Sequence, residues 1–365
     1  MTDIFLDADV SAAATLPGSA YCSEDTFARE QSALFPHAWL GLPPLSLGEE
    51  FAAPVEILPG VLSEPLCLTR DAAGEERLVS NVCTHRGMLV LTEAGPAKRL
   101  RCTYHGRRFA LCGRLEAAPG FEGAKDFPTP RDDLPQVALQ HWGPLRFVAL
   151  EPSQPFDTWL EPFQPWFDGL PLGDLEPMPS HSKTYDVAAN WKLYLDNYLE
   201  GFHIPTVHKS LAAALDVGGY EARCVGHGSV QVGRVSAGEA TLPLGPAHPL
   251  FGEDIGALYL HLFPTTLLNI YPWGISVNHI RPVAAARTRV TFESYVWDRS
   301  QINEGAGADL DRVEQEDEVV VEGVQRGLRS RLYDRGRYAP SHEQAVHHFH
   351  REWLARVQER EEAVP

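Results

Sequence analysis

Short apolar runs separated by Gly and Pro fill the chain from Trp39 to about Pro152. Residues 55–58 (Val-Glu-Ile-Leu) and 66–69 (Leu-Cys-Leu-Thr) are two of these runs. Short runs bounded by turn-forming residues are typical of β-strands joined by tight turns. The pattern therefore predicts a small antiparallel β domain in this region.

The chain after this region alternates between helical and strand patterns. Helical patterns cover roughly residues 190–202, 308–331 and 341–360. Strand patterns cover residues 229–232, 258–263, 266–270, 275–280 and 289–296. The last four strands lie close together in sequence, so we expect them to pair as an antiparallel meander. A sheet covered by helices gives this part of the chain an α+β fold.

Two segments flank the predicted β domain. Residues 24–31 form a short helical pattern before it, and the Pro-rich residues 152–179 follow it as a linker or wrapping segment. At 365 residues the chain is long for a single core, and its length alone suggests two domains.

Composition narrows the class of protein. Hydrophobic residues make up 44% and charged residues 22%, which is typical of a globular protein with a large core. The 31 Lys and Arg against 49 Asp and Glu give a formal charge of −18, which argues against nucleic acid and anionic membranes as partners. Residues 1–16 lack the basic segment and apolar core of a signal peptide, and no apolar stretch is long enough to span a membrane. These features predict a cytoplasmic protein.

Two Cys/His pairs stand near one third of the chain, Cys83-Thr84-His85 and Cys102-Thr103-Tyr104-His105. Two thiolates can bind one iron and two imidazoles the other, which is the ligation of a Rieske [2Fe–2S] cluster. A structural zinc site is the alternative, but zinc fingers usually pair Cys with Cys and His with His, whereas each pair here is mixed. The other cysteines show no regular spacing and suggest free thiols in a reducing compartment. They are Cys22, Cys67, Cys112 and Cys224.

A second candidate metal site lies at the end of the helical pattern that starts near residue 190. His203 and His208 are five residues apart, so on a straight helix they would point about 140° apart. Pro205 stands between them and should bend or end the helix, which lets both imidazoles converge. Two histidines and one carboxylate leave one face of a non-haem Fe(II) open for O2 and substrate.

The acidic run from Glu314 to Glu322 offers several carboxylates for this iron. Asp317 shares a helical face with the apolar residues Val320, Val321, Val324 and Leu328. It should therefore point into the protein, where a metal would compensate the cost of its burial. Glu318 aligns with Glu322 and Gln325, towards solvent, and Glu316 is the main alternative ligand. Glu200 precedes His203 by three residues and could hydrogen-bond this histidine on the same helical face.

These motifs resemble the large (α) subunits of the Rieske non-haem iron oxygenases, over nearly the whole chain. The family pattern C-x-H…C-x2-H matches Cys83, His85, Cys102 and His105, and its (D/E)-x2-H-x4-H pattern matches Glu200, His203 and His208. The distant aspartate ligand of the family matches Asp317. The chain departs from the family at Arg107, where a tryptophan is common.

The resemblance implies a small antiparallel β Rieske domain, residues 38–152, inserted into a helix-grip (START-like) catalytic domain made of residues 1–37 and 153–365. It implies a [2Fe–2S] cluster and a mononuclear Fe(II) as cofactors, with O2 and a small molecule as substrates. Electrons would come from a separate NAD(P)H-dependent reductase that carries flavin and iron–sulfur groups. The implied assembly is a homotrimer, in which Glu200 connects a cluster histidine of one subunit with an iron histidine of the next.

Further stretches resemble the branch of this family that oxidises quaternary ammonium compounds. They are residues 262–264, 269–272, 324–328 and 349–350, although Thr265 stands where that branch often has asparagine. This branch implies N-methyl oxidation inside an aromatic cage that holds the cation. Available aromatic residues, each equally suited to the core of a sheet, are Tyr259, Phe263, Tyr271 and Trp273. Hydroxylation of an aromatic ring and electron transfer without catalysis are the alternative functions.

Overall fold

The computed structural model describes residues 4–45, 47–214, 217–235, 238–302 and 310–358. The chain forms two compact units, one made of Met1–Gly41 with Ser153–Pro365 and the other of Leu42–Pro152. The second unit is thus an insertion in the first. The insertion begins after residue 41, whereas it was expected to begin after residue 37. It ends after residue 152, as expected.

The inserted unit consists of short antiparallel strands. Its larger sheet runs in the order β10-β9-β4-β3-β2-β5, and a smaller sheet pairs β6, β7 and β8. The strands are β2 (Phe51–Val55), β3 (Leu66–Arg70), β4 (Glu76–Ser80), β5 (Gly95–Pro96), β6 (Leu100–Arg101), β7 (Arg108–Phe109), β8 (Leu115–Ala117), β9 (Gln136–Trp142) and β10 (Leu145–Ala149). Strand β1 (Leu40–Leu42) lies at the boundary of the two units. The predicted antiparallel β structure is confirmed.

The larger unit is built on one antiparallel sheet with the order β11-β18-β17-β16-β15-β14-β13, and β12 also pairs with β18. The strands are β11 (Glu176–Pro177), β12 (Lys183–Val187), β13 (Glu221–Val225), β14 (Gly228–Arg234), β15 (Ile255–Leu262), β16 (Thr266–Tyr271), β17 (Gly274–Ala284) and β18 (Arg287–Val296). The predicted meander, β15 to β18, is confirmed, with longer strands than expected. Every residue of β16 is buried, so both faces of the sheet are covered there.

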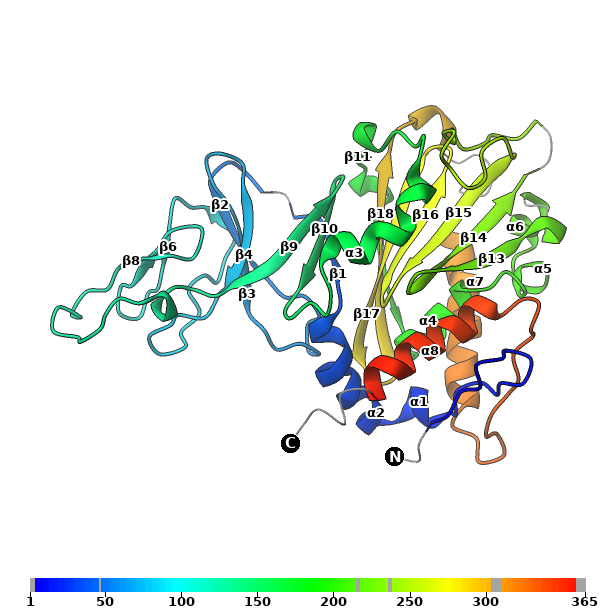
Figure 1. Ribbon diagram of the computed structural model, residues 1–365, viewed down its shortest axis with the longest axis horizontal. Helices are drawn as coiled ribbons and strands as arrows, with labels where there is room; N and C mark the ends of the chain where they lie inside the picture. Colours follow the sequence, from blue (N-terminus) through cyan, green and yellow to red (C-terminus); the bar gives the residue numbers. More distant parts are fainter. Residues whose placement is uncertain (1–3, 46, 215–216, 236–237, 303–309, 359–365) are drawn as a thin grey trace. The chain divides into compact units, whose positions relative to one another are not determined.

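Three longer helices pack around this sheet, α4 (Trp191–Tyr198), α7 (Leu310–Gly327) and α8 (Gln344–Gln358). Helix α8 packs on β13 and β14 (Figure 1). Helix α4 contacts both α7 and β17. The shorter helices are α1 (Ser19–Cys22), α2 (Glu24–Arg29), α3 (Phe156–Leu160), α5 (Ile204–Val207) and α6 (Lys209–Ala214). Among the described residues, no helix is both long and apolar enough to cross a membrane.

Helix α4 starts as predicted, because the Asn190 side chain caps it by accepting a hydrogen bond of 3.1 Å from the backbone N–H of Lys192. Its predicted end at residue 202 is wrong, since the helix stops at Tyr198. Pro205 then stands in the first turn of α5, a favoured place for proline, and so starts a new helix instead of bending the first. His203 and His208 flank this single turn.

A buried ion pair attaches α4 to the N-terminal segment of the same unit. The ammonium group of Lys192 contacts the carboxylate of Glu30, and both side chains are fully buried. The same carboxylate accepts hydrogen bonds of 2.8 Å from the indole N–H groups of Trp191 and Trp353. Because each buried charge has partners, the pair fixes α4 against both ends of the unit.

The predicted orientation of α7 is partly wrong. Gln325, expected at the surface, is 2% exposed, and Val324, expected inside, is 43% exposed. The Oε1 atom of Gln325 accepts a hydrogen bond of 2.7 Å from the backbone N–H of Asn190, which draws this polar side chain inward. The Pro-rich residues 152–179 wrap the unit rather than forming a loose linker, since they bury Trp159 and Phe163.

Candidate metal centres

The four predicted cluster ligands come from two loops of the inserted unit. Cys83 and His85 follow β4, and Cys102 and His105 follow β6. Both cysteines are 2% exposed and belong to one hydrophobic core cluster. The imidazole rings of His85 and His105 lie with their centroids 4.6 Å apart. The structure therefore brings together all four side chains, with the thiols inside and His105 exposed.

The two loops have the same backbone turn. The carbonyl oxygen of Cys83 accepts a hydrogen bond of 3.0 Å from Gly87, and that of Cys102 accepts one of 3.1 Å from Gly106. Gly87 and Gly106 have φ angles of 72° and 76°, which favour glycine. Each turn is thus closed by its own backbone and presents a Cys and a His from its own segment.

The side chains fit a [2Fe–2S] cluster. The Nδ1 atom of His85 is buried and has no hydrogen-bond partner among the residues described, an arrangement that is costly unless the atom binds a ligand. Burial raises the pKa of the Cys83 thiol, and the adjacent Cys102 raises it further while the backbone N–H of His85 lowers it. Two close thiols of this kind need a cation before both can be thiolates.

Arg107 follows Gly106 in the second ligand loop. It is 3% exposed, and its guanidinium lies 4.5 Å from the ring centroid of Phe121 and 5.2 Å from that of Phe127. It also donates a hydrogen bond of 3.1 Å to the hydroxyl of Thr84, between Cys83 and His85. Arg107 thereby fills an aromatic environment and supports the first ligand loop.

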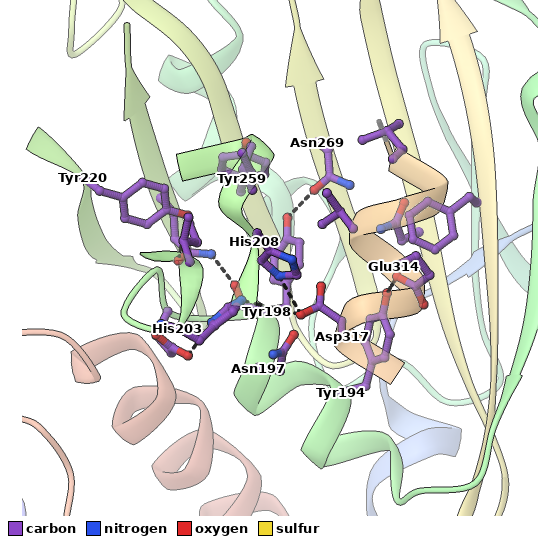
Figure 2. A pocket seen from close by; sticks show the side chains of 18 of the residues that line it. Tyr194, Asn197, Tyr198, His203, His208, Tyr220, Tyr259, Asn269, Glu314 and Asp317 are labelled. Carbon is purple, nitrogen blue, oxygen red and sulfur yellow. Dashed lines mark hydrogen bonds and ion pairs between the residues drawn. The ribbon is translucent and has the colours of Figure 1, made fainter. Parts of the chain in front are cut away.

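In the larger unit, His203, His208 and Asp317 form a second possible metal site. One ligand atom of each residue lies within 4.8 Å of those of the other two. The Oδ1 atom of Asp317 is 2.9 Å from Nε2 of His208 and 3.6 Å from Nε2 of His203 (Figure 2). A donor set of two imidazoles and one carboxylate suits a mononuclear non-haem iron.

Glu316, the alternative ligand, lies on the other side of the same imidazole. Its Oε2 atom is 2.8 Å from Nδ1 of His208, and its Oε1 atom accepts a hydrogen bond of 3.1 Å from Arg312. Burial lowers the pKa of His208, but the two carboxylates of Asp317 and Glu316 together raise it above its ordinary value. Asp317 therefore faces both histidines, whereas Glu316 is in a position to orient one of them.

Glu200 holds the other histidine. Its Oε1 atom is 2.6 Å from Nδ1 of His203, and its Oε2 atom accepts hydrogen bonds from the backbone N–H groups of Phe202 and His203. Glu200 thus fixes the turn between α4 and α5 as well as the orientation of the His203 ring. The expected hydrogen bond between Glu200 and this histidine is present in the structure.

A pocket opens beside the two histidines and Asp317. Aromatic side chains form much of its wall. Around Tyr259, the ring centroids of Tyr271, Tyr220 and Tyr198 lie at 6.0, 6.3 and 6.4 Å. Burial raises the pKa of each of these four phenols, so they stay neutral.

Two of these four tyrosines, Tyr259 and Tyr271, were predicted from the sequence. Phe263 and Trp273, the other two expected residues, do not line this pocket. Trp273 lies behind Tyr271, with ring centroids 5.3 Å apart, and Phe263 borders a different cavity. Tyr198 and Tyr220 were missed, although Tyr198 stands only two residues before Glu200, close to the histidine motif.

Two family models of known proteins match this chain. Residues 176–359 match "Ring hydroxylating alpha subunit (catalytic domain)", and residues 54–128 match "Rieske [2Fe-2S] domain". The chloroplastic choline monooxygenase of Arabidopsis thaliana is 28% identical over 93% of this chain and 82% of its own length. The carnitine monooxygenase oxygenase subunit of Escherichia coli K12 is 28% identical over 87% of this chain and 85% of its own length.

Solved structures share the fold. A quaternary ammonium Rieske monooxygenase in complex with L-carnitine superimposes with a TM-score of 0.73 at 23% identity, covering 96% of this chain and 97% of that one. The naphthalene 1,2-dioxygenase of a Rhodococcus species gives a TM-score of 0.74 at 17% identity, with 94% of each chain covered.

Proposed function

The chain belongs to the ring-hydroxylating α subunits, Rieske oxygenases that use O2, a [2Fe–2S] cluster and a mononuclear iron, and we propose that it oxidises a quaternary ammonium compound. Such enzymes take electrons from a separate reductase. In a monooxygenation, one oxygen atom enters a C–H bond of the substrate and the other leaves as water, with two electrons and two protons consumed. Hydroxylation of an N-methyl group would release formaldehyde and leave a demethylated amine.

The tyrosine wall of the pocket carries this proposal. A cation is attracted to the face of an aromatic ring within about 6 Å of its centroid. Tyr198, Tyr220, Tyr259 and Tyr271 offer several such faces next to the metal site. The names of the choline and carnitine monooxygenases support the same substrate class, since both substrates carry a quaternary ammonium group.

When bound, the cluster supplies single electrons and the mononuclear iron activates O2. We assign Cys83 and Cys102 to one iron of the cluster and His85 and His105 to the other. His203, His208 and Asp317 would hold the mononuclear iron and leave its pocket side open. Glu316 and Glu200 each keep one of these imidazoles in orientation through its Nδ1 atom.

We further propose a homotrimer in which electrons pass between subunits, with Glu200 as the connecting residue. A relative of the same fold is described as a quaternary ammonium Rieske monooxygenase with inter-subunit electron transfer. The carboxylate of Glu200 already holds His203 within its own chain. A second hydrogen bond to a cluster histidine of a neighbouring chain would complete the connection.

Aromatic ring hydroxylation is the weaker alternative. The pocket presents three carboxyl groups, those of Glu200, Glu314 and Asp317, which suit a cation better than a neutral hydrocarbon or an aromatic acid. Electron transfer without catalysis does not explain why two histidines and an aspartate converge beside a pocket.

Electron paramagnetic resonance of the ferrous protein with nitric oxide tests the proposal. Nitric oxide stands in for O2, and its signal reports changes close to the iron. We expect choline or carnitine to perturb the signal and benzoate to leave it unchanged. A signal that responds only to aromatic acids would contradict the proposed substrate class. The absence of any iron–nitrosyl signal in iron-replete protein would favour an electron carrier.

A further inference from the structure

Glu314 has a buried carboxyl oxygen that has no hydrogen-bond partner in the part of the chain that the structure describes. The side chain lies on α7, three residues before Asp317, lines the pocket and is 3% exposed. Its Oε2 atom accepts a hydrogen bond of 2.6 Å from the hydroxyl of Tyr194 (Figure 2). Its Oε1 atom is buried without a hydrogen-bond partner among the described residues. A polar atom left in this way marks a place where a ligand can contribute the missing interaction.

The other carboxylates of the pocket are already engaged. Glu200 contacts His203, and Asp317 contacts both histidines. No Lys or Arg is found among the described residues that line the pocket. Even with a ferrous ion in place, the three carboxylates would exceed the two positive charges of the ion. An ionised Glu314 would carry the surplus negative charge.

The ionisation of Glu314 depends on what occupies the pocket. Burial raises its pKa well above the ordinary value, Asp317 raises it further, and the hydrogen bond from Tyr194 lowers it. A cation beside the carboxyl group favours the charged form and opposes the effect of burial. A bound ammonium group and an ionised Glu314 therefore stabilise each other.

On the basis of the proposed function, we infer that Glu314 is the anionic contact for the ammonium group and selects a quaternary ammonium cation with an uncharged tail, such as an amino alcohol, over a zwitterion. The carboxylate of a zwitterion would be buried near Glu314 and Asp317, and the described residues that line the pocket include no Lys or Arg to compensate its charge. An alcohol tail needs only uncharged hydrogen-bonding groups. The side-chain amides of Asn197 and Asn278, in the pocket lining, provide such groups.

Calorimetric binding to the metal-loaded protein, without reductase, tests this inference. The ligands are choline, its uncharged isostere 3,3-dimethyl-1-butanol, and carnitine. We expect choline to bind the wild-type protein at least about tenfold more tightly than either of the others. In Glu314→Gln, the Kd for choline should rise about tenfold or more, while that for the isostere changes less than about twofold.

Two further variants and a check of metal loading separate charge from packing. Glu314→Asp keeps the charge and should retain a preference for choline over the isostere. Glu318→Gln alters a glutamate of the same helix outside the pocket lining and should leave all three affinities unchanged. Iron content and the visible spectrum of the cluster show whether each variant is folded and loaded.

The outcomes distinguish this inference from the proposed function. Equal weakening of choline and the isostere in Glu314→Gln would assign the residue to packing and overturn the inference. Equal affinities of the wild-type protein for choline and carnitine, unchanged in Glu314→Gln, would overturn the inference but leave the proposed function standing. Failure of the wild-type protein to bind any quaternary ammonium compound would contradict the proposed function itself.

Discussion

Asp317 and Glu316, consecutive residues of α7, contact opposite nitrogen atoms of a single imidazole, that of His208. Two adjacent carboxylates therefore have different surroundings. Asp317 meets the nitrogen that faces His203, and Glu316 meets the nitrogen that faces away and is itself held by Arg312. This arrangement gives each carboxylate a separate expected effect on iron binding.

Asp317→Ala should lose the mononuclear iron and keep the cluster, because the inserted unit carries the cluster ligands on its own turns. Glu316→Gln should keep the iron but bind it about 10- to 100-fold more weakly, because His208 loses its orienting carboxylate. Metal analysis and the visible spectrum of the cluster measure both effects. Loss of iron in Glu316→Gln together with full retention in Asp317→Ala would reverse the two assignments.

Glu200→Gln should retain both metals and strongly slow turnover. The amide can still accept one hydrogen bond from His203, but it lacks the negative charge that supports this histidine and the proposed connection between subunits. Re-oxidation of the reduced cluster by O2 in the presence of substrate, followed by its absorbance, measures electron transfer directly. Glu176→Gln, on an exposed strand, is the control. Normal re-oxidation in Glu200→Gln would rule out the connecting function.

Lys192→Met should destabilise the larger unit by about 3–5 kcal/mol, because it leaves the buried carboxylate of Glu30 without its cation. Arg289→Met removes an ion pair whose two side chains are each 46% exposed, and should cost about 1 kcal/mol or less. Urea unfolding followed by tryptophan fluorescence compares the two. Equal losses of stability would show that burial of the Lys192–Glu30 pair has no special energetic effect.

Two buried histidines make the free energy of unfolding depend on pH. Burial lowers the pKa of His227 to about 3 and that of His261 to about 4. As the pH falls below about 6.5, the unfolded chain gains protons at these positions while the native chain does not. The free energy of unfolding should therefore decrease as the pH falls from about 6.5 towards about 4, by at most about 1.4 kcal/mol per pH unit for each group.

His261→Gln should remove part of this dependence, so that its unfolding midpoint in urea changes less between about pH 7 and about pH 5 than that of the wild-type protein. His181→Gln, at an exposed position, serves as the control. An unchanged or steeper dependence in His261→Gln would exclude this histidine as the origin.

The features that were predicted best from the sequence are those formed by residues close together in the chain. The two Cys/His pairs and the pair of histidines around Pro205 are local patterns, and the structure brings each set together. The side of α7 that faces the protein interior was harder to predict, because valines lie on several sides of this helix and Val319 is 71% exposed. Its orientation depends instead on the contact of Gln325 with Asn190, which is distant in sequence.

The pocket wall could be predicted only in part. Because both faces of the central sheet are covered, buried aromatic residues occur on each side of a strand without an alternating polar pattern that would tell the sides apart. Tyr259 and Trp273 therefore looked equivalent in the sequence, although only Tyr259 lines the pocket. Tyr220 reaches the pocket from the residue before β13, and no local motif announces it.

The contacts of the Glu30 carboxylate determine which of the two units can be completed first during translation. Its partners are Trp191 and Lys192 in the middle of the chain and Trp353 close to the end. During translation, Glu30 leaves the ribosome long before these donors, so the larger unit cannot complete its interior until residue 353 has been made. The inserted unit is continuous from Leu42 to Pro152 and faces no such delay. All of its residues are synthesised before the histidines and the aspartate of the second metal site.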